Sequence, residues 1–272
     1  MSRSRPVALT IAGSDSSGGA GIVADLKTFE AHGVWGTVAL TAVTAQNTLG
    51  VQAVETLTPE MVRAQIASVV ADLGVDAAKT GMLGSADVVA EVARTVVELG
   101  VRPLVVDPVM VASTGGRLLD TDAVDAVIRH LLPHAAVVTP NLAEAGALVG
   151  FEVTDRAAME RAARALGAMG PQVVLVKGGH LTGDASPDCM LVAGEDPVWL
   201  EGARLPDGGA HGSGCVLAAA ICAELARGME PADACVAAKR FVARAIEAGP
   251  ALGAGVVPVE PAWAARQTEG LP

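Results

Sequence analysis

The segment Val-Ala-Leu-Thr-Ile-Ala (7–12), followed by Gly-Ser-Asp-Ser-Ser-Gly-Gly-Ala-Gly (13–21), decides the class of fold. The first six residues form a short apolar run that is typical of a buried strand. The region 18–32 is expected to be the end of the glycine-rich loop followed by a helix that ends near His32. A strand, a loop and a helix in this order begin a βαβ unit, so the segment predicts an α/β protein with a parallel sheet.

The same alternation continues along the chain. Further strands are expected over 38–43, 51–57, 76–79, 104–107, 136–138 and 173–177, with an edge pair over 189–192 and 198–201. Helices are expected over 59–73, 85–99, 121–132, 141–149, 155–169, 213–227 and 231–248. Ligands of such sheets bind beyond the carboxyl ends of the strands. The polar residues expected at those ends are Asp15, Asn47, Lys79, Asp107, Asn141 and Lys177.

Composition limits the function classes. The 272 residues contain no linker-like run, so one domain over 1–272 is expected. A net charge of −11 and an aromatic content of 2% argue against a nucleic-acid partner, although a small phosphorylated ligand needs only a local positive field. The uncharged stretch 33–54 is long enough for a membrane span, but its glycines and amide side chains favour strands and turns. The four cysteines lack C-x-x-C spacing, which predicts no disulfide framework, no zinc site and a cytoplasmic location.

His-Gly-Ser-Gly-Cys (211–215) stands directly before the apolar helix expected over 213–227. Glycines let a backbone approach a ligand closely, and the first turn of a helix carries N–H groups without internal partners. Gly212, Ser213, Gly214 and Cys215 therefore predict an anion site. A glycine-rich turn that only begins a buried helix explains the same residues equally well.

Polar side chains follow three of the predicted strands. Asp107 and Lys177 each end a strand, and Asn141 and Glu144 lie one helical turn apart. Carboxylates suit Mg²⁺, which binds through one or two of them together with phosphate, and a lysine suits a nucleotide phosphate. A capping pair is the equally weighted alternative for Asn141 and Glu144.

Seven motifs in order resemble the hydroxymethylpyrimidine/phosphomethylpyrimidine kinases of thiamin biosynthesis, which belong to the ribokinase-like superfamily. The resemblance covers about residues 6–260. The motifs are Gly-Ser-Asp-Ser-Ser-Gly-Gly-Ala-Gly-Ile-Val-Ala-Asp-Leu-Lys (13–27), Thr-Ala-Gln-Asn-Thr-Leu-Gly-Val (44–51), Lys-Thr-Gly-Met-Leu (79–83), Asp-Pro-Val-Met-Val (107–111), Thr-Pro-Asn-Leu-Ala-Glu-Ala (139–145), Val-Lys-Gly-Gly-His (176–180) and His-Gly-Ser-Gly-Cys (211–215).

The resemblance implies a three-layer α/β/α kinase that uses ATP and Mg²⁺ and is commonly a homodimer. Its members phosphorylate the hydroxymethyl group of 4-amino-5-hydroxymethyl-2-methylpyrimidine and then phosphorylate the monophosphate. By motif match, the residues that should line the pyrimidine site are Gly13, Asp25, Gln46, Met82 and Val109. Gly212 to Cys215 should form the anion hole, Lys177, Asn141 and Gly214 should meet the nucleotide, and Asp107 and Glu144 should organise Mg²⁺.

Cys215 occupies a position where superfamily relatives usually carry an aspartate base. A helix N-terminus lowers the pKa of a thiol, so Cys215 is expected to have a lowered pKa and to assist deprotonation of the first acceptor. A neutral thiol would also spare the anionic second acceptor from repulsion. The alternative is that Cys215 only fills space beneath the anion hole.

Several positions depart from the family pattern. Ser16 stands where proline is common, and Val23 where glutamine is common. Ala-Ser-Thr-Gly-Gly (112–116) replaces a usual Ala-Lys-Ser-Gly-Asp, and Ala210, Ser213 and Val216 replace threonines. The change at Ser113 removes a positive charge near the expected phosphates.

Two other functions fit parts of the sequence. The first is a pyridoxal or pyridoxine kinase of the same superfamily. Gln46 argues against it, because a glutamine amide complements the amino group and ring nitrogen of an aminopyrimidine. The second is a binding protein that has lost turnover, which the presence of Asp107, Glu144, Lys177 and Cys215 argues against.

Overall fold

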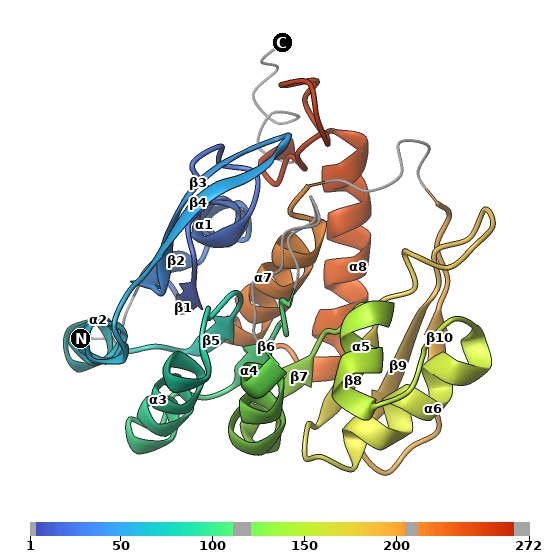
Figure 1. Ribbon diagram of the computed structural model, residues 1–272, viewed down its shortest axis with the longest axis horizontal. Coiled ribbons are helices and arrows are strands. Elements are labelled where there is room, and N and C mark those ends of the chain that lie inside the picture. Colours follow the sequence, from blue (N-terminus) through green and yellow to red (C-terminus); the bar gives the residue numbers. More distant parts are fainter. Residues whose placement is uncertain (1–3, 111–120, 205–210, 264–272) are drawn as a thin grey trace.

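An eight-stranded sheet forms the centre of the protein (Figure 1). The computed structural model describes residues 4–110, 121–204 and 211–263. The strand order is β10-β9-β8-β7-β6-β5-β1-β2, parallel from β2 to β8 and antiparallel at β9 and β10. The strands are β1 (Val7–Ala12), β2 (Trp35–Leu40), β5 (Ala77–Thr80), β6 (Leu104–Val106), β7 (Val137–Val138), β8 (Val173–Val176), β9 (Asp188–Val192) and β10 (Val198–Leu200). The mostly parallel sheet and its antiparallel edge pair are confirmed.

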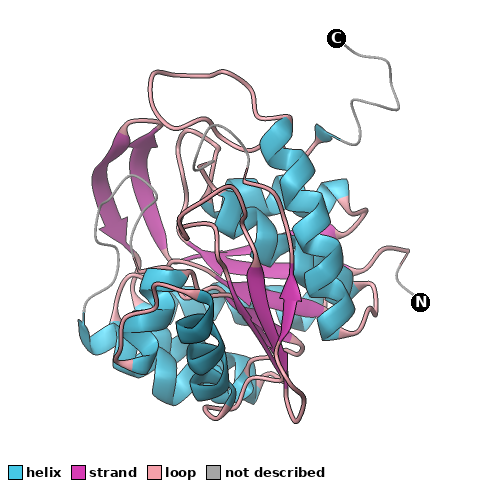
Figure 2. Cartoon of the chain, turned by 90° about the vertical axis from the view of Figure 1, so that its right-hand side faces the viewer, coloured by secondary structure: helices cyan, strands magenta, loops and turns pink. Residues whose placement is uncertain are grey.

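Helices cover both faces of this sheet (Figure 2). One face carries α1 (Gly21–Ala31), α7 (Ser213–Ala226) and α8 (Pro231–Glu247). The other carries α2 (Pro59–Asp72), α3 (Ala86–Glu98), α4 (Thr121–Ala126), α5 (Leu142–Val149) and α6 (Arg156–Gly167). Successive strand side chains point to opposite faces, so Leu9 and Ile11 join the core beneath α2–α6, while Ala8 joins the core beneath α7.

Helix α7 is the most enclosed of these helices. Every residue from Val216 to Ala226 is buried, because α7 packs between α1, α8 and strands β1, β5 and β6. Its many alanines allow this close approach on several sides. The helix begins after Gly212, whose φ of 83° lies in the left-handed region. A β-carbon on Gly212 would overlap the carbonyl oxygen of Gly19, so glycine is what lets the 13–21 loop lie against the start of α7.

The region 38–57 differs from its expected form. The strand expected over 38–43 is divided at Thr41 between β2 and β3 (Ala42–Asn47), because Thr41 bonds to Ala12 and Met82 where the chain leaves the sheet. Strand β3 pairs with β4 (Gly50–Thr56) in a separate hairpin (Figure 2). Asn47 therefore lies at the hairpin turn and not at a strand end of the main sheet.

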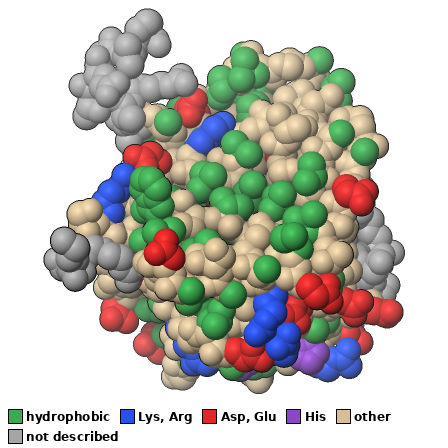
Figure 3. Space-filling view, turned by 90° about the vertical axis from the view of Figure 1, so that its left-hand side faces the viewer, with side chains coloured by type: hydrophobic (Ala, Val, Ile, Leu, Met, Phe, Trp, Pro, Cys, Tyr) green, Lys and Arg blue, Asp and Glu red, His purple; other side chains and the backbone are tan. Residues whose placement is uncertain are grey.

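The hairpin presents apolar side chains to solvent. Val43, Leu49 and Val54 are 48%, 66% and 45% exposed. Figure 3, which views this side of the molecule, shows hydrophobic side chains spread over the middle of the face and charged side chains along its lower edge. This exposed apolar surface is available for contact with another protein surface.

The helix expected over 121–132 is shorter than predicted. Helix α4 ends at Ala126 and continues as a π-helical turn over Val127–Leu131 and a 3₁₀ turn over Leu132–His134. Pro133 lacks a backbone N–H and prevents a regular α-helical ending. Among the described residues, none of the helices combines the length and the apolar character needed to cross a bilayer.

Candidate active site

The carboxyl ends of β6 and β8 bring Asp107 and Lys177 together. The Nζ atom of Lys177 lies 3.1 Å from Oδ1 of Asp107, and Thr139 donates a hydrogen bond of 3.1 Å to the same oxygen. Asp107 is buried, whereas the Lys177 side chain remains 16% exposed. Burial opposes the charge of Lys177, but the neighbouring carboxylates of Asp107 and Glu144 outweigh it and raise the pKa of the lysine. Lys177 is therefore a fixed cation at the mouth of the site.

Glu144 joins this cluster from the first turn of α5. A capping box is present, because Asn141 accepts from the Glu144 N–H at 2.9 Å and Glu144 accepts from the Asn141 N–H at 2.8 Å. The same carboxylate lies 3.8 Å from Nζ of Lys177. Burial raises the pKa of Glu144 to about 7, with Asp107 adding to the rise and Lys177 opposing it. The Glu144 side chain thus caps the start of α5 and also lies beside Lys177.

Asp107 and Glu144 could bind magnesium together with oxygen ligands from phosphate and water. Within residues 4–110, 121–204 and 211–263, no group of three or more His, Cys, Asp or Glu side chains could hold a metal ion by itself. Mg²⁺ is usually bound through one or two carboxylates, with phosphate oxygens and water as its other ligands. Asp107 and Glu144, which both contact Lys177, match that donor set.

The start of α7 faces the same cluster. The first helical bond runs from the Val216 N–H to the Gly212 carbonyl, so the N–H groups of Ser213, Gly214 and Cys215 precede the internal bonding pattern. A β-carbon on Gly214 would lie 3.3 Å from Nζ of Lys177 and 4.0 Å from Oδ2 of Asp107. Glycine thus lets the backbone and the lysine approach each other, and both favour an anion between them.

A second lysine lies beneath this point in a fully enclosed ion pair. Lys79, in the interior of β5, contacts both carboxylate oxygens of Asp25 from α1 at 3.0 and 3.1 Å. Thr10 donates a further bond of 2.6 Å to Asp25. Neither charged side chain has exposed surface. Burial opposes the charge on Lys79, but the nearby Asp25, Cys215 and Asp107 outweigh it and raise the pKa of the lysine, which keeps it charged.

Cys215 is half-buried above this pair. Burial raises the pKa of its thiol to about 11. Lys79 and a hydrogen bond from the Gly21 N–H act in the opposite direction, while Asp25 and Asp107 add to the rise. The expectation of a lowered thiol pKa is therefore wrong, because burial and two carboxylates outweigh the helix N-terminus.

The expected substrate side lies along β1, β3 and the segments after β5 and β6. Gly13 follows β1 and lies so close to Met82 that a β-carbon on Gly13 would overlap the Met82 methyl group. Val109 is half-buried and donates its N–H to the Asp107 carbonyl at 2.9 Å. Gln46, also half-buried, lies on β3 where the hairpin register shifts between Ala45 and Gln46. Such a bulge turns a side chain away from the regular alternation.

Comparison with known proteins identifies the family. The family model for phosphomethylpyrimidine kinase matches residues 15–260. The chain belongs to the phosphomethylpyrimidine kinase family. One relative, the hydroxymethylpyrimidine/phosphomethylpyrimidine kinase of Streptomyces coelicolor, is 50% identical over 259 residues, which are 95% of each chain. Among solved structures, an ADP complex of pyridoxal kinase from Bacillus subtilis is 39% identical with a TM-score of 0.88, covering 95% of this chain and 98% of that one. A phosphomethylpyrimidine kinase from Clostridium difficile is 38% identical with a TM-score of 0.77, covering 89% and 100%.

These comparisons confirm the ribokinase-like α/β/α fold class of this family member. The structure brings together most of the residues that were expected at its phosphate-binding end: Asp107, Asn141, Glu144, Lys177, Gly212, Ser213, Gly214 and Cys215. Asp25 differs from the expectation, because its carboxylate has no exposed surface with which to line a ligand site. The substituted segment 112–116 and Ala210 lie outside the described residues.

The sequence did not predict the contacts of two residues of this site, Lys79 and His211. Lys79 was expected at a strand end but lies inside β5, and a lysine within a short apolar strand is a signal for a buried ion pair. His211 received no role, yet its Nε2 lies 2.7 Å from Oδ2 of Asp15, a residue 196 positions away. No local pattern could reveal that second pair.

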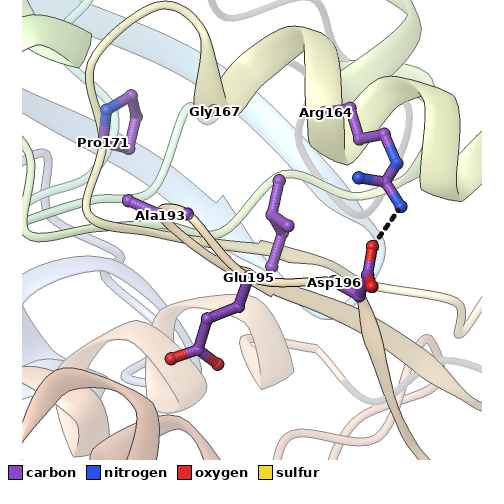
Figure 4. Close-up of a pocket in the computed structure, with 8 residues that line it drawn as sticks. Arg164, Gly167, Pro171, Ala193, Glu195 and Asp196 are labelled. Carbon is purple, nitrogen blue, oxygen red and sulfur yellow. Dashed lines mark hydrogen bonds and ion pairs between the residues drawn. The ribbon is translucent and has the colours of Figure 1, made fainter.

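A separate hollow lies at the opposite end of β8 (Figure 4). It is bounded by the end of α6 and the turn after β9, and Arg164 across it pairs with Asp196 at 3.0 Å. None of the expected site residues of this kinase family lines it. The one cationic side chain that lines this hollow, Arg164, is outnumbered by the acidic side chains of Glu195 and Asp196, which disfavours a phosphorylated ligand.

The raised thiol pKa predicts how Cys215 reacts. Alkylation requires the thiolate, so labelling of Cys215 by iodoacetamide should rise about 100-fold between pH 7 and pH 9 without reaching a plateau. Mass spectrometry of the peptide containing Cys215 measures this rate, and Cys215→Ser identifies its signal. A plateau below pH 8.5 would mean that the helix N-terminus prevails over burial.

Proposed function

We propose that this protein transfers a phosphoryl group from ATP to the hydroxymethyl group of 4-amino-5-hydroxymethyl-2-methylpyrimidine, and then to the resulting monophosphate, as a kinase of thiamin biosynthesis. The observation that carries the proposal is the meeting of Lys177 and Asp107 with the glycine-rich first turn of α7. The family membership and the 50% identity to a kinase of that name support the choice of substrate.

Positioning and charge stabilisation account for most of phosphoryl-transfer catalysis, and the site offers both. Lys177 would contact the ATP phosphates, and the N–H groups of Ser213, Gly214 and Cys215 would bind the oxygens of the transferred group. Asp107 and Glu144 would hold Mg²⁺, which when bound neutralises phosphate charge. Asn141 supports this arrangement by fixing the start of α5 and the place of Glu144.

Cys215 suits a site that serves two different acceptors. The alcohol must lose a proton during the first transfer, whereas the monophosphate is already an anion. A thiol with a pKa of about 11 carries no charge at neutral pH and does not repel the anion. In the first step the thiol would accept a hydrogen bond from the alcohol, and the alcohol proton would pass to an oxygen of the transferred phosphoryl group. The charge of Lys79 would stabilise the negative charge that develops near Cys215.

Gln46 is the residue that would choose the ring, with Gly13, Met82 and Val109 as its apolar surroundings. An amide offers one acceptor and one donor to the amino group and ring nitrogen of the pyrimidine. Pyridoxal kinase activity is the second candidate, because the solved pyridoxal kinase from Bacillus subtilis shares 39% identity and the fold. The pyridoxal ring has no amino group for Gln46, which favours the pyrimidine.

The homodimer implied by the family resemblance stays a prediction. The exposed apolar residues Val43, Leu49 and Val54 of the β3–β4 hairpin would support it. A sedimentation mass near 27.2 kDa would contradict it.

Incubation of the protein with ATP, Mg²⁺ and each candidate alcohol tests the proposed function. With the pyrimidine alcohol, mass spectrometry should detect the monophosphate first and the diphosphate later. Pyridoxal should react more slowly, because one side of the Gln46 amide then lacks a partner. A product from pyridoxal alone would assign the second candidate activity instead, and no product from either would contradict kinase function.

The substitution Glu144→Gln separates the charge of this side chain from its capping role. Glutamine preserves the capping box, since its amide oxygen still accepts from the Asn141 N–H. Loss of the carboxylate should raise the Mg²⁺ concentration for half-maximal activity about 10-fold, whereas Lys177→Ala should mainly lower kcat. An unchanged Mg²⁺ titration in Glu144→Gln would reduce Glu144 to a helix cap.

A further inference from the structure

We infer that Asp188, oriented by Lys239, is a positioning residue that fixes the backbone of Lys177 and thereby the place of the Lys177 ammonium in the site. The inference rests on the proposed function, because it assumes that Lys177 contacts the ATP phosphates. Neither Asp188 nor Lys239 belongs to the motifs that carry the family resemblance.

The backbone is held on both sides of Lys177, but by different groups. The Lys177 N–H donates to the Pro140 carbonyl at 2.8 Å, which continues the parallel pairing of β7 and β8. The following N–H, from Gly178, lies beyond the end of β8 and donates to Oδ1 of Asp188 at 3.0 Å. Because peptide groups are planar, only the two backbone dihedrals of Lys177 separate these two bonds. Together the bonds fix the direction in which the Lys177 side chain leaves the backbone.

Glycine at position 178 is what brings the two segments close enough for this bond. A β-carbon on Gly178 would overlap the carbonyl oxygen of Pro187, the residue before Asp188. The close approach places the Gly178 N–H within reach of a short carboxylate side chain. Asp188 begins β9 and is buried, where a hydrogen bond is electrostatically stronger than in water.

Lys239 of α8 orients the Asp188 carboxylate. Its Nζ atom donates to Oδ2 of Asp188 at 2.7 Å and to the Ser186 carbonyl at 2.9 Å. The Asp188 side chain is 9% exposed and the Lys239 side chain 16%, so each charge depends on the other for compensation. With Oδ2 bound to Lys239, Oδ1 faces the Gly178 N–H. The ion pair thus connects α8 to the peptide group that follows Lys177.

The place of the Lys177 ammonium leaves little room for a shift. Its Nζ lies 3.1 Å from Oδ1 of Asp107 and 3.8 Å from Oε2 of Glu144. A β-carbon on Gly214 would lie 3.3 Å from the same atom. A displacement of about 1 Å in a group that positions reacting atoms can lower a rate about 100-fold. Asp188 acts on the transfer through Lys177, since it holds the peptide group and not the ammonium.

The substitution Asp188→Asn tests this hold with little change in size. Asparagine has one oxygen in place of two. If this oxygen faces Gly178, the amide nitrogen faces the Lys239 ammonium and two donors oppose each other. If the oxygen faces Lys239, the Gly178 N–H loses its acceptor. The second arrangement avoids opposed donors, so Asp188→Asn should release the peptide group after Lys177.

We measure kcat and the KM for ATP, with the pyrimidine alcohol as acceptor, in the wild-type protein, in Asp188→Asn, in Lys177→Ala and in the variant that combines both substitutions. Lys177→Ala is the arm that tests the proposed function. Glu201→Gln is the matched control, because Glu201 follows β10 and forms an exposed ion pair with Arg156 at 2.8 Å. Circular dichroism establishes that each variant is folded. If Asp188→Asn does not fold, Asp188→Ser, with a shorter side chain and no opposed donor, decides by the same comparisons.

Asp188→Asn should lower kcat about 10-fold and leave the KM for ATP within threefold, which is the pattern expected of Lys177→Ala. In the Lys177→Ala background the same substitution should change kcat less than threefold, because the residue through which it acts is gone. Glu201→Gln should change neither constant.

A kcat within threefold of wild type in the folded Asp188→Asn variant would overturn the inference. So would an equal fold-reduction in the wild-type and Lys177→Ala backgrounds, which a loss of active protein alone would produce. A kcat within threefold of wild type in Lys177→Ala would instead refute the proposed role of Lys177 itself.

Discussion

Two lysines balanced by two carboxylates set the electrostatics on which the site depends. Transfer of a lysine from water into a protein interior costs several kcal/mol unless an opposite charge compensates it. Lys79 is compensated by Asp25 and Lys177 by Asp107. The two lysines differ in exposure, since Lys79 has none whereas 16% of the Lys177 side chain is accessible. Lys177 can therefore contact a ligand directly. The buried Lys79 acts only through its charge, on Cys215 at the start of α7.

The state of Cys215 follows from this balance. A sulfur atom between an uncompensated lysine and a helix N-terminus would be a thiolate. Here burial raises the pKa of the thiol and keeps it protonated, and the carboxylates of Asp25 and Asp107 oppose the effect of Lys79. Under the proposed function, the N–H groups of the first turn and Lys177 would bind the phosphate oxygens, and Cys215 would add no negative charge beside the acceptor. A site of this kind would receive either a neutral alcohol or an anionic phosphate.

Local sequence patterns predicted much of this arrangement, and long-range pairing explains what they missed. The sequence predicted where Asp107 and Lys177 lie, because the carboxyl ends of parallel strands meet at one edge of the sheet. It also predicted the 212–215 turn, because a glycine-rich turn is typical of the start of a helix such as α7. The β3–β4 hairpin was not, since the turn of the chain at Thr41 depends on bonds to Ala12 and Met82 from other elements. The thiol pKa was misjudged because the helix-terminus rule says nothing of burial. The His211–Asp15 contact joins residues 196 positions apart, and a single sequence carries no trace of it.

The most direct test of the central claim is the acceptor preference of Cys215→Asp. Aspartate adds a fixed negative charge beside the acceptor, which repels the monophosphate but leaves a base available for the alcohol. The ratio of kcat/KM for the alcohol to kcat/KM for the monophosphate should therefore rise at least 10-fold above that of the wild-type protein, while Cys215→Ser should change it little. A ratio that stays within threefold of wild type in Cys215→Asp would contradict the claim that a neutral group at this position lets one site serve both acceptors.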